Sequence, residues 1–190
     1  MTGVLVPVLV AVLGAAPVQV GDAAPPLDGV PGTFAGNVTL VVFFATWCRP
    51  CHRAFPHLAE VQGQLDGRVR MVLVEAGEDP DEVRAFLAAN APPPGAVIGT
   101  DMSGETRRRW GIRSFPSFYV VDRDGLVQWT EHGFGEDSPA LMLRALHAAL
   151  GDPPPPRPGR RRKGAPRAAP SSPASPAHEF VKGVEILRGP

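Results

Sequence analysis

Trp47-Cys48-Arg49-Pro50-Cys51 is the stretch that decides the fold, and it holds both cysteines of the chain. It follows the apolar run 40–44 and precedes an amphipathic stretch from 52 to 65. An apolar strand that ends in Cys-x-x-Cys, with the second cysteine entering a helix, is a layout typical of dithiol chemistry. Unpaired backbone N–H groups and the macrodipole at a helix N-terminus stabilise a thiolate, which is the species that attacks disulfides.

Two cysteines so close together cannot link distant parts of the chain, so a disulfide framework is excluded and stability must come from an apolar core. A structural zinc site needs four ligands, and the sequence has no second cysteine pair. His52 and His57 would complete a Cys2His2 set only by crowding into about one and a half turns of helix. We therefore expect no metal site.

The 190 residues are 44% hydrophobic and 20% charged, which is typical of one globular domain with some additional chain. The net charge is zero, but residues 151–190 carry eight Lys or Arg against three Asp or Glu, a sum of +5, so residues 1–150 carry −5. A body with this charge does not favour a specific nucleic-acid partner. Any binding to an anionic surface is assigned to the basic tail.

Both ends of the chain differ in composition from its middle. Residues 4–16 form an uncharged apolar run with the length and small-residue end of a secretory signal, although no Lys or Arg precedes it and Pro17 is awkward after a cleavage site. We expect residues 1–17 to be a signal or membrane anchor and the protein to reach the periplasm or cell envelope. The alternatives are a mis-assigned start or a buried strand, with a cytoplasmic location. Residues 152–190, rich in Pro, Arg and Ala, are expected to be a disordered tail.

The hydrophobic pattern between residues 18 and 151 alternates between strands and helices. Strands are expected at 39–44, 68–74, 96–98, 118–121 and 126–130. Helices are expected at 52–65, from 79 to the proline run at 92–94, over a short segment ending at 109, and at 138–150. This order predicts an α/β domain with a central mixed sheet, helices on both faces and an antiparallel edge.

Several motifs in combination resemble the thioredoxin fold and, more narrowly, the TlpA/ResA-type exported thiol–disulfide oxidoreductases. They are Val20-Gly21-Asp22-Ala23-Ala24-Pro25, the run 40–51, Phe115-Pro116, and Val121-Asp122-Arg123-Asp124-Gly125. The resemblance covers about residues 20–150. It implies a thioredoxin-like domain at 18–151 that exchanges thiols and disulfides.

The resemblance also implies a role for individual residues. Cys48 is expected to be the exposed nucleophile and Cys51 the resolving thiol. Pro116 is expected to follow a cis peptide bond and to face the disulfide, where it offers no N–H and leaves neighbouring backbone groups for an extended substrate. Trp47 and Phe115 would flank the sulfurs as an apolar contact surface for the partner.

The two residues between the cysteines have separate expected effects. The positive charge of Arg49 should favour the Cys48 thiolate, and a lower thiol pKa stabilises the reduced form and raises the reduction potential. Pro50 limits the turn and so holds the two sulfurs close.

One departure from the resemblance concerns proton transfer. Relatives carry a buried acid that helps the resolving thiol lose its proton, and the corresponding positions here are Val42 and Ala54, both apolar. Glu75, at the end of the neighbouring strand, is the expected substitute because strand ends converge beside the active site. His52 is a second candidate, with an exposed helix residue as the alternative interpretation.

These roles require no metal or organic cofactor, only the redox-active Cys48–Cys51 disulfide. The expected partners are disulfides of exported proteins, with apocytochrome c cysteines among them, and an upstream membrane or soluble thiol that donates electrons. We expect the chain to be a monomer. The sequence leaves the direction of electron flow open.

Two other functions compete with this interpretation. Residues 48–52 also fit Cys-x-x-Cys-His, the attachment motif of c-type haem, which would make the chain an electron carrier. His52 would then be one axial ligand, and the candidates for the second are Met71, Met102 and Met142. The fully apolar strand before the motif and the α/β pattern count against haem. A redox-inert thioredoxin-like binding module is disfavoured because both cysteines are present.

Overall fold

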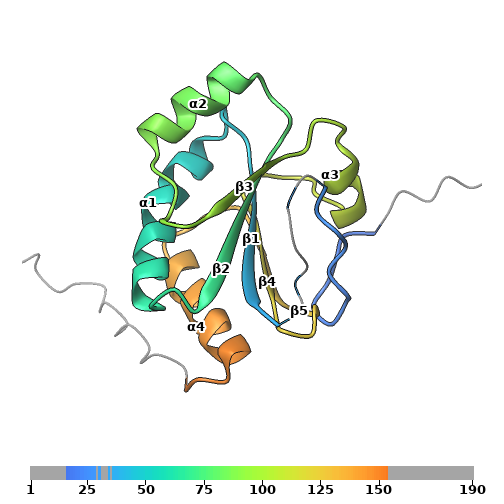
Figure 1. Cartoon of the computed structure of the whole chain (residues 1–190), viewed down its shortest axis with the longest axis vertical. Helices are drawn as coiled ribbons and strands as arrows, with labels where there is room; N and C mark the ends of the chain where they lie inside the picture. Colours follow the sequence, from blue (N-terminus) through green and yellow to red (C-terminus); the bar gives the residue numbers. More distant parts are fainter. Residues whose placement is uncertain (1–15, 29, 31–33, 35, 154–190) are drawn as a thin grey trace, which may run out of the picture. The chain divides into compact units, whose positions relative to one another are not determined.

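The computed structural model describes residues 16–28, 30, 34 and 36–153. These residues form the alternation of strands and helices expected from the sequence (Figure 1). The strands are β1 (Val38–Phe44), β2 (Val69–Glu75), β3 (Val97–Thr100), β4 (Ser117–Val121) and β5 (Val127–His132). The helices are α1 (Arg49–Gln64), α2 (Pro80–Ala89), α3 (Glu105–Trp110) and α4 (Ser138–Leu150).

Strand β1 lies at the centre of a five-stranded sheet of order β3-β2-β1-β4-β5. It pairs parallel with β2 and antiparallel with β4, and β5 pairs antiparallel with β4 to form one edge. All seven residues of β1 are buried, which explains why its sequence is nearly all apolar instead of alternating. The predicted mixed sheet with an antiparallel edge is confirmed.

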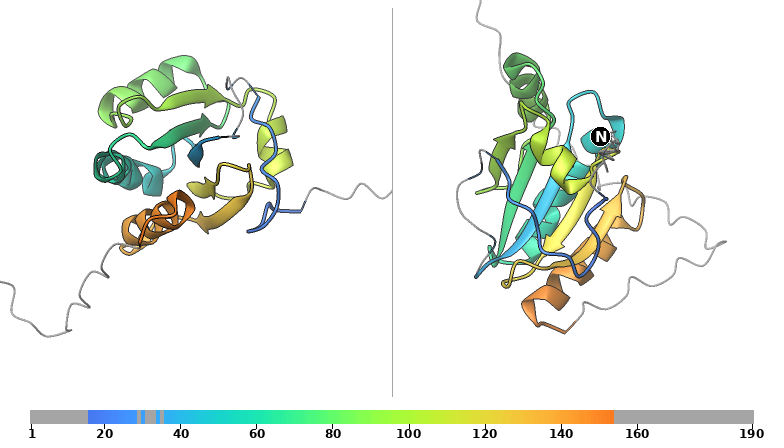
Figure 2. Two further views of the ribbon diagram at one scale, coloured as in Figure 1. Left: turned by 60° about the horizontal axis from the view of Figure 1, so that its bottom comes forward. Right: turned by 90° about the vertical axis from the view of Figure 1, so that its right-hand side faces the viewer.

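The side chains of β1 point alternately to two apolar layers, as the pleat of a strand requires. Leu40, Val42 and Phe44 pack in the layer that contains buried residues of α1, α2 and α4. Val41 and Phe43 pack in the other layer, with Trp110 of α3. Figure 2 shows α1, α2 and α4 on one side of the sheet, and α3 with the N-terminal segment on the other. Helices on both faces are therefore confirmed.

Element boundaries differ from the expected ones by a few residues. Helix α1 begins at Arg49 instead of 52, because Cys48 already occupies its N-cap position. Strand β5 starts at Val127 instead of 126 because Leu126 forms an isolated bridge with Ala23. Helix α4 has the predicted bounds, 138–150.

The expected signal or anchor at 1–17 and the expected tail at 152–190 lie, apart from residues 16–17 and 152–153, outside the described residues. Val18 is buried, and its N–H donates a hydrogen bond to the carbonyl of Trp110 at 3.2 Å. A domain that starts at 18 is compatible with this contact and stays a prediction. Over the residues that the structure describes, every helix is too short or too polar to cross a membrane.

Trp110 is the large side chain that ties α3 to the sheet. It is fully buried, and its ring centroid lies 5.4 Å from that of Phe43 in β1 and 4.9 Å from that of Tyr119 in β4. Removing the ring leaves a cavity between α3 and the two central strands. We expect Trp110→Ala to lower the free energy of unfolding by about 3–5 kcal/mol.

The measurement is chemical denaturation of the oxidised protein, and Trp47→Ala is the matched control. Trp47 is 70% exposed, so its truncation should lower the free energy of unfolding by less than about 1 kcal/mol. Equal losses in the two variants would contradict the role given to Trp110.

Candidate active site

The two cysteines lie where β1 passes into α1. Cys48 is the N-cap residue of α1, and it forms a disulfide with Cys51, with the two Cα atoms 5.2 Å apart. The backbone N–H of Cys51 donates to Cys48 Sγ at 3.2 Å. An N-cap side chain accepts a hydrogen bond from the first turn of its helix. The Cys51 N–H is shared between this sulfur and the carbonyl oxygen of Cys48, which lies at 2.9 Å. The expected position at a helix N-terminus is confirmed.

The expectation that Cys48 is exposed is wrong for this state. Cys48 is only 3% exposed and Cys51 only 1%, and both belong to the apolar layer that contains α1 and β1. In the disulfide form Cys48 thus lies against the start of α1 and the core beneath it. Cys48 is therefore almost completely covered by the protein in the disulfide form.

The residues between and before the cysteines face solvent. Arg49 is exposed and Pro50 is half-buried, and they are the first two residues of α1. Proline fits this position because the first turn has no use for its missing N–H. Trp47 is 70% exposed and meets the ring of Phe115 edge-on, with 5.8 Å between ring centroids. The structure thus places an aromatic pair directly beside Cys48.

The peptide bond between Phe115 and Pro116 is cis, as the resemblance implied. Pro116 is buried, and its carbonyl accepts a hydrogen bond from the N–H of Gly133 at 2.7 Å. Ser117 begins β4 and lies opposite Phe43 in the antiparallel register. This pairing brings the proline to the same end of the sheet as Cys48, although the two are far apart in the sequence.

The two positions where relatives carry a buried acid are indeed apolar and buried. Val42 is 0% exposed and Ala54 is 1% exposed. Glu75 is fully buried at the end of β2, directly opposite Phe44 of β1 in the parallel register. The sequence-based expectation that strand ends bring this acid to the active-site end of the sheet agrees with the register.

Glu75 is held in an unusual environment for a carboxyl group. Its Oε1 accepts a hydrogen bond from the backbone N–H of Glu78 at 2.8 Å, whereas its Oε2 has no hydrogen-bond partner among the described residues. Burial raises the pKa of Glu75, and the neighbouring Glu78 carboxyl raises it further, although the Glu78 N–H acts in the opposite direction. Glu75 therefore holds its proton to a higher pH than an exposed glutamate.

Glu78 is a site residue that the sequence analysis missed. Its Oε2 accepts from the backbone N–H of Thr46 at 2.7 Å, and its Oε1 accepts from the Thr46 hydroxyl at 2.9 Å. Gly77 makes the turn that allows this contact: its φ is +80°, and a Cβ there would lie 2.6 Å from the carbonyl oxygen of Asp101. Two acids thus connect the end of β2 to the segment just before Cys48.

His52 also contacts Thr46, in the segment just before Cys48. It is exposed, its Nε2 lies 2.9 Å from the carbonyl oxygen of Thr46, and its Nδ1 lies 3.1 Å from the amide nitrogen of Asn90. The ring lies 4.7 Å from that of Phe86. A carbonyl only accepts, so Nε2 carries the proton and Nδ1 accepts from Asn90. Both ring nitrogens are engaged, an arrangement that does not favour His52 as an axial haem ligand.

The methionines considered above as the second axial ligand are not placed to bind a haem either. Met71 and Met142 are each 1% exposed and pack in the apolar layer around α1. Met102 is 70% exposed. Side chains packed in the core cannot present sulfur to a haem beside His52, so the geometry fits a dithiol site better than a haem site.

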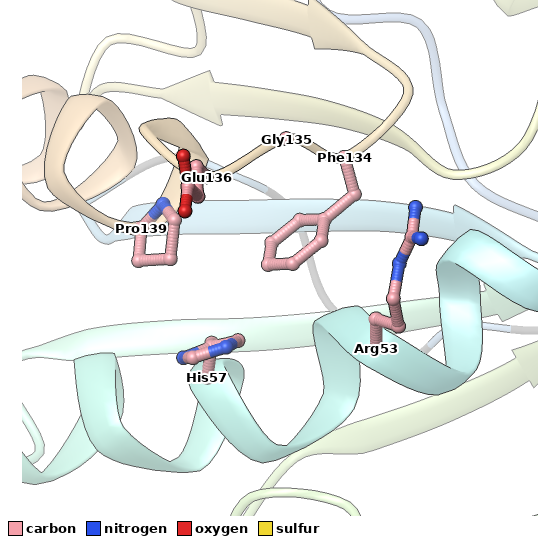
Figure 3. A pocket seen from close by; sticks show the side chains of 6 residues that line it. All are labelled: Arg53, His57, Phe134, Gly135, Glu136 and Pro139. Atoms are coloured by element: carbon pink, nitrogen blue, oxygen red, sulfur yellow. The ribbon is translucent and has the colours of Figure 1, made fainter.

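A groove lies between α1 and the segment that leads into α4 (Figure 3). Arg53 and His57 of α1 form one side, and Phe134, Gly135, Glu136 and Pro139 form the other. His57 and Phe134 stack with 5.5 Å between ring centroids. Figure 3 shows Arg53 and Glu136 at opposite ends of this stacked pair, so the groove carries both signs of charge.

Comparisons with known proteins agree with this site. The family model described as Redoxin matches residues 30–145. The chain is 32% identical over 120 residues to the thiol:disulfide interchange protein CycY of Rhizobium leguminosarum bv. viciae, covering 62% of this chain and 63% of that protein. It is 27% identical over 96 residues to the thiol-disulfide oxidoreductase ResA of Bacillus thuringiensis, covering 50% and 54%. The chain thus spans about half to two thirds of the length of these curated relatives.

A solved structure shares the fold over nearly its whole length. The crystal structure of a DsbE-type thiol:disulfide interchange protein from Chlorobium tepidum superposes with a TM-score of 0.64 at 26% sequence identity. The match covers 70% of this chain and 99% of that one. The thioredoxin fold and the resemblance to TlpA/ResA-type proteins, both predicted from the sequence, are confirmed.

The raised pKa of Glu75 makes stability depend on pH in the opposite direction to that of an acid whose pKa is lowered by folding. Because the folded state holds the proton more tightly than the unfolded state, the contribution of Glu75 to stability is largest below the ordinary glutamate pKa of about 4.3 and is lost as pH rises through the raised value. We expect Glu75→Gln to remove this fall. The variant should gain stability over the unaltered protein as pH rises from about 4 to 8.

The measurement is urea denaturation of the oxidised protein at several pH values. Glu136→Gln serves as the control because Glu136 is exposed. A difference between Glu75→Gln and the unaltered protein that does not change with pH would show that Glu75 titrates as it does in the unfolded chain.

Proposed function

The chain belongs to the Redoxin family, and from the site described above we propose that it is a thiol–disulfide oxidoreductase whose reactive pair is Cys48 and Cys51. The observation that carries this proposal is the Cys48–Cys51 disulfide at the start of α1, where the Cys51 N–H donates to Cys48 Sγ. A thiolate at Cys48 would accept the same hydrogen bond more strongly because it is charged. The helix end therefore favours the nucleophilic form of this cysteine.

In the reducing direction, the Cys48 thiolate attacks one sulfur of a substrate disulfide. This step forms a mixed disulfide and releases the other substrate sulfur as a thiolate. Cys51 then loses its proton and attacks the sulfur of Cys48, which releases the second substrate thiolate and forms the Cys48–Cys51 disulfide. Two electrons pass from the cysteine pair to the substrate, and an external dithiol returns them by the same exchange.

The groups around the pair would position the substrate. Trp47 and Phe115 supply an exposed apolar contact, and burial of Cys48 limits which sulfur can approach it. Pro116 lacks an N–H, so it cannot compete with the substrate for backbone hydrogen bonds beside the disulfide. Arg49 adds a fixed positive charge at the helix end, which favours the Cys48 thiolate.

We assign to Glu75 the task of accepting the proton of Cys51. The burial that raises its pKa makes it a better base near neutral pH than an ordinary glutamate. Its contact with Glu78, and the contact of Glu78 with Thr46, link it to the segment that carries the cysteines. This acid would take over the function of the buried acid that is replaced by Val42 and Ala54.

The compartment and the partners form the finer part of the proposal. The apolar run at 4–16 supports export, with residues 1–17 as signal or anchor, 18–151 as the domain and 152–190 as a tail that can reach an anionic surface. The substrates would then be disulfides of exported proteins, and the resemblance to TlpA/ResA-type proteins suggests the cysteine pair of apocytochromes c. A thiol donor in or near the membrane would supply the electrons to a monomeric domain.

The roles of the two cysteines predict different behaviour when each is replaced. Cys51→Ser keeps the nucleophile but cannot resolve the mixed disulfide, so it should accumulate a covalent complex with a disulfide-containing Cys-x-x-Cys-His peptide. Cys48→Ser lacks the nucleophile and should form little of this complex. Mass spectrometry without reductant measures both. Equal trapping by the two variants would refute the assignment, and no trapping by either would refute the proposed reaction.

The role of Glu75 predicts a change in pH dependence and not only in rate. At pH 7, Glu75→Gln should slow the resolving step roughly a hundredfold, the lower end of what a positioned base contributes. The loss should shrink toward pH 9, because the Cys51 thiol then ionises unaided. Stopped-flow release of peptide from a preformed Cys48 mixed disulfide measures this step. A variant that is slow by the same factor at every pH would show that Glu75 is merely structural.

A further inference from the structure

A second hollow, of about 550 Å³, lies on the α3 side of Phe115. Three arginines line it: Arg107 and Arg108 of α3, and Arg113 in the loop that leads to the cis peptide bond. Such a concentration of one charge is unexpected in a chain whose first 150 residues carry a net charge of −5. The hollow is therefore a positively charged place on a domain whose net charge is negative.

Two of the guanidinium groups converge. Gly104 has a φ of +70°, and a Cβ built on it would lie 3.2 Å from Arg107 Nη2 and 3.2 Å from Arg108 Nη1. Both side chains thus lie over the same small residue, which leaves room for them. Arg108 Nη1 donates one N–H to the carbonyl of Ser103 at 3.3 Å and keeps a second N–H. Guanidinium groups are planar donors that match the two oxygens of a carboxylate, so two of them side by side favour an anion between them.

The acids near the hollow do not neutralise all of its charge. Arg107 Nε lies 3.0 Å from Asp101, and Arg108 Nη2 lies 2.6 Å from Glu105. The neighbouring Arg109 pairs with Asp28 at 2.9 Å and with Glu105 at 3.7 Å. Arg113 is exposed, and no acid in the described part of the chain forms an ion pair with it. One positive charge is therefore left in excess.

One residue, Phe115, connects the hollow to the active site. Phe115 lines the hollow, and its ring also meets Trp47, the neighbour of Cys48. Among the described residues, none accepts a hydrogen bond from the backbone N–H groups of Arg113, Ser114 or Phe115. An extended substrate that pairs with this loop would pass from the disulfide directly over Arg113.

Resting on the proposed function, we propose that this hollow binds a carboxylate side chain of the protein substrate. The substrates preferred by the enzyme would carry an Asp or Glu close to the reacting cysteine. The cysteine pair performs the exchange, and the arginines select which disulfide reaches it.

The long-range charge of the domain makes this preference specific. A domain with an excess of acids repels acidic partners in general, so the local attraction is gained only when the carboxylate enters the hollow. The groove of Figure 3 provides the natural comparison: Arg53 also lies near the cysteines, but the groove contains Glu136 as well. We therefore assign the preference to the hollow on the α3 side alone.

The experiment uses two synthetic peptides, each with one internal disulfide, that differ only in carrying Asp or Asn at two positions near a cysteine. The reduced full-length protein is mixed with each peptide, and the reduced peptide is quantified after an acid quench. We expect the Asp peptide to react roughly fivefold faster than the Asn peptide, as ion pairs at a partly exposed site allow. The advantage should disappear in about 0.5 M NaCl, where charges are screened within roughly 4 Å.

The variant that tests the hollow is Arg108→Gln combined with Arg113→Gln. Arg107 is left in place because it pairs with the buried carboxylate of Asp101. The ratio of the two peptide rates should fall from about five to about one in this variant. Arg53→Gln and Arg123→Gln are the controls; Arg53 lies near the cysteines, whereas Arg123 follows β4 at the opposite end of the sheet. Both should keep the ratio of the unaltered protein.

The outcomes separate this inference from the proposed function. If the unaltered protein reduces both peptides at the same rate, the inference fails and the oxidoreductase function stands; if it reduces neither, the function itself fails. A ratio that survives in the double variant, or that falls equally in Arg53→Gln, would overturn the assignment to the hollow. Sedimentation with phosphatidylglycerol vesicles is compared for the unaltered protein and the double variant. If only the unaltered protein sediments with the vesicles, and the two proteins reduce the peptides at the same rates, the hollow is a membrane contact and the proposed carboxylate preference is overturned.

Discussion

The candidate site depends on the pairing of β1 with a strand on each side. The parallel register with β2 sets Glu75 opposite Phe44, and the antiparallel register with β4 sets Ser117 opposite Phe43. Because side chains alternate with a period of two, a shift of one residue in either register would turn a whole strand over. Close packing of β1 opposes this shift, because a shifted strand would bring side chains of different volume against its neighbours in both buried layers. These two registers place the dithiol, the acid and the cis-proline at the same end of the sheet.

Much of this arrangement could be predicted from the sequence because it follows from local pattern. The apolar run before Cys48, the helix after it and the alternation of strands and helices each have a signature that is independent of distant residues. Even Glu75 was predictable, because the ends of parallel strands meet at one edge of a sheet. The cis bond before Pro116 came from family resemblance, since the residues themselves carry no signal for it.

The rest depended on contacts that no local pattern encodes. Glu78 reaches Thr46 only because Gly77 turns the chain sharply after β2, against the carbonyl of Asp101. The low exposure of Cys48 comes from packing beneath the helix end, whereas the family resemblance implied an exposed sulfur. The convergence of Arg107 and Arg108 over Gly104 is likewise invisible in a sequence that reads simply as a basic helix.

The buried acid lies at the end of β2 in this chain, whereas the family resemblance implied an acid on β1 or α1. An acid on β1 or on the inner face of α1 would interrupt the apolar layer that contains Val42 and Ala54. Placing it at the end of β2 keeps that layer intact and leaves the cost of burial with a single carboxyl oxygen that has no partner among the described residues. That cost falls when the carboxyl is protonated, because a neutral acid loses less solvation than a carboxylate. A group that resists ionisation in the folded state takes up a proton readily, so the strain of burying Glu75 and its fitness as a proton acceptor have the same physical origin.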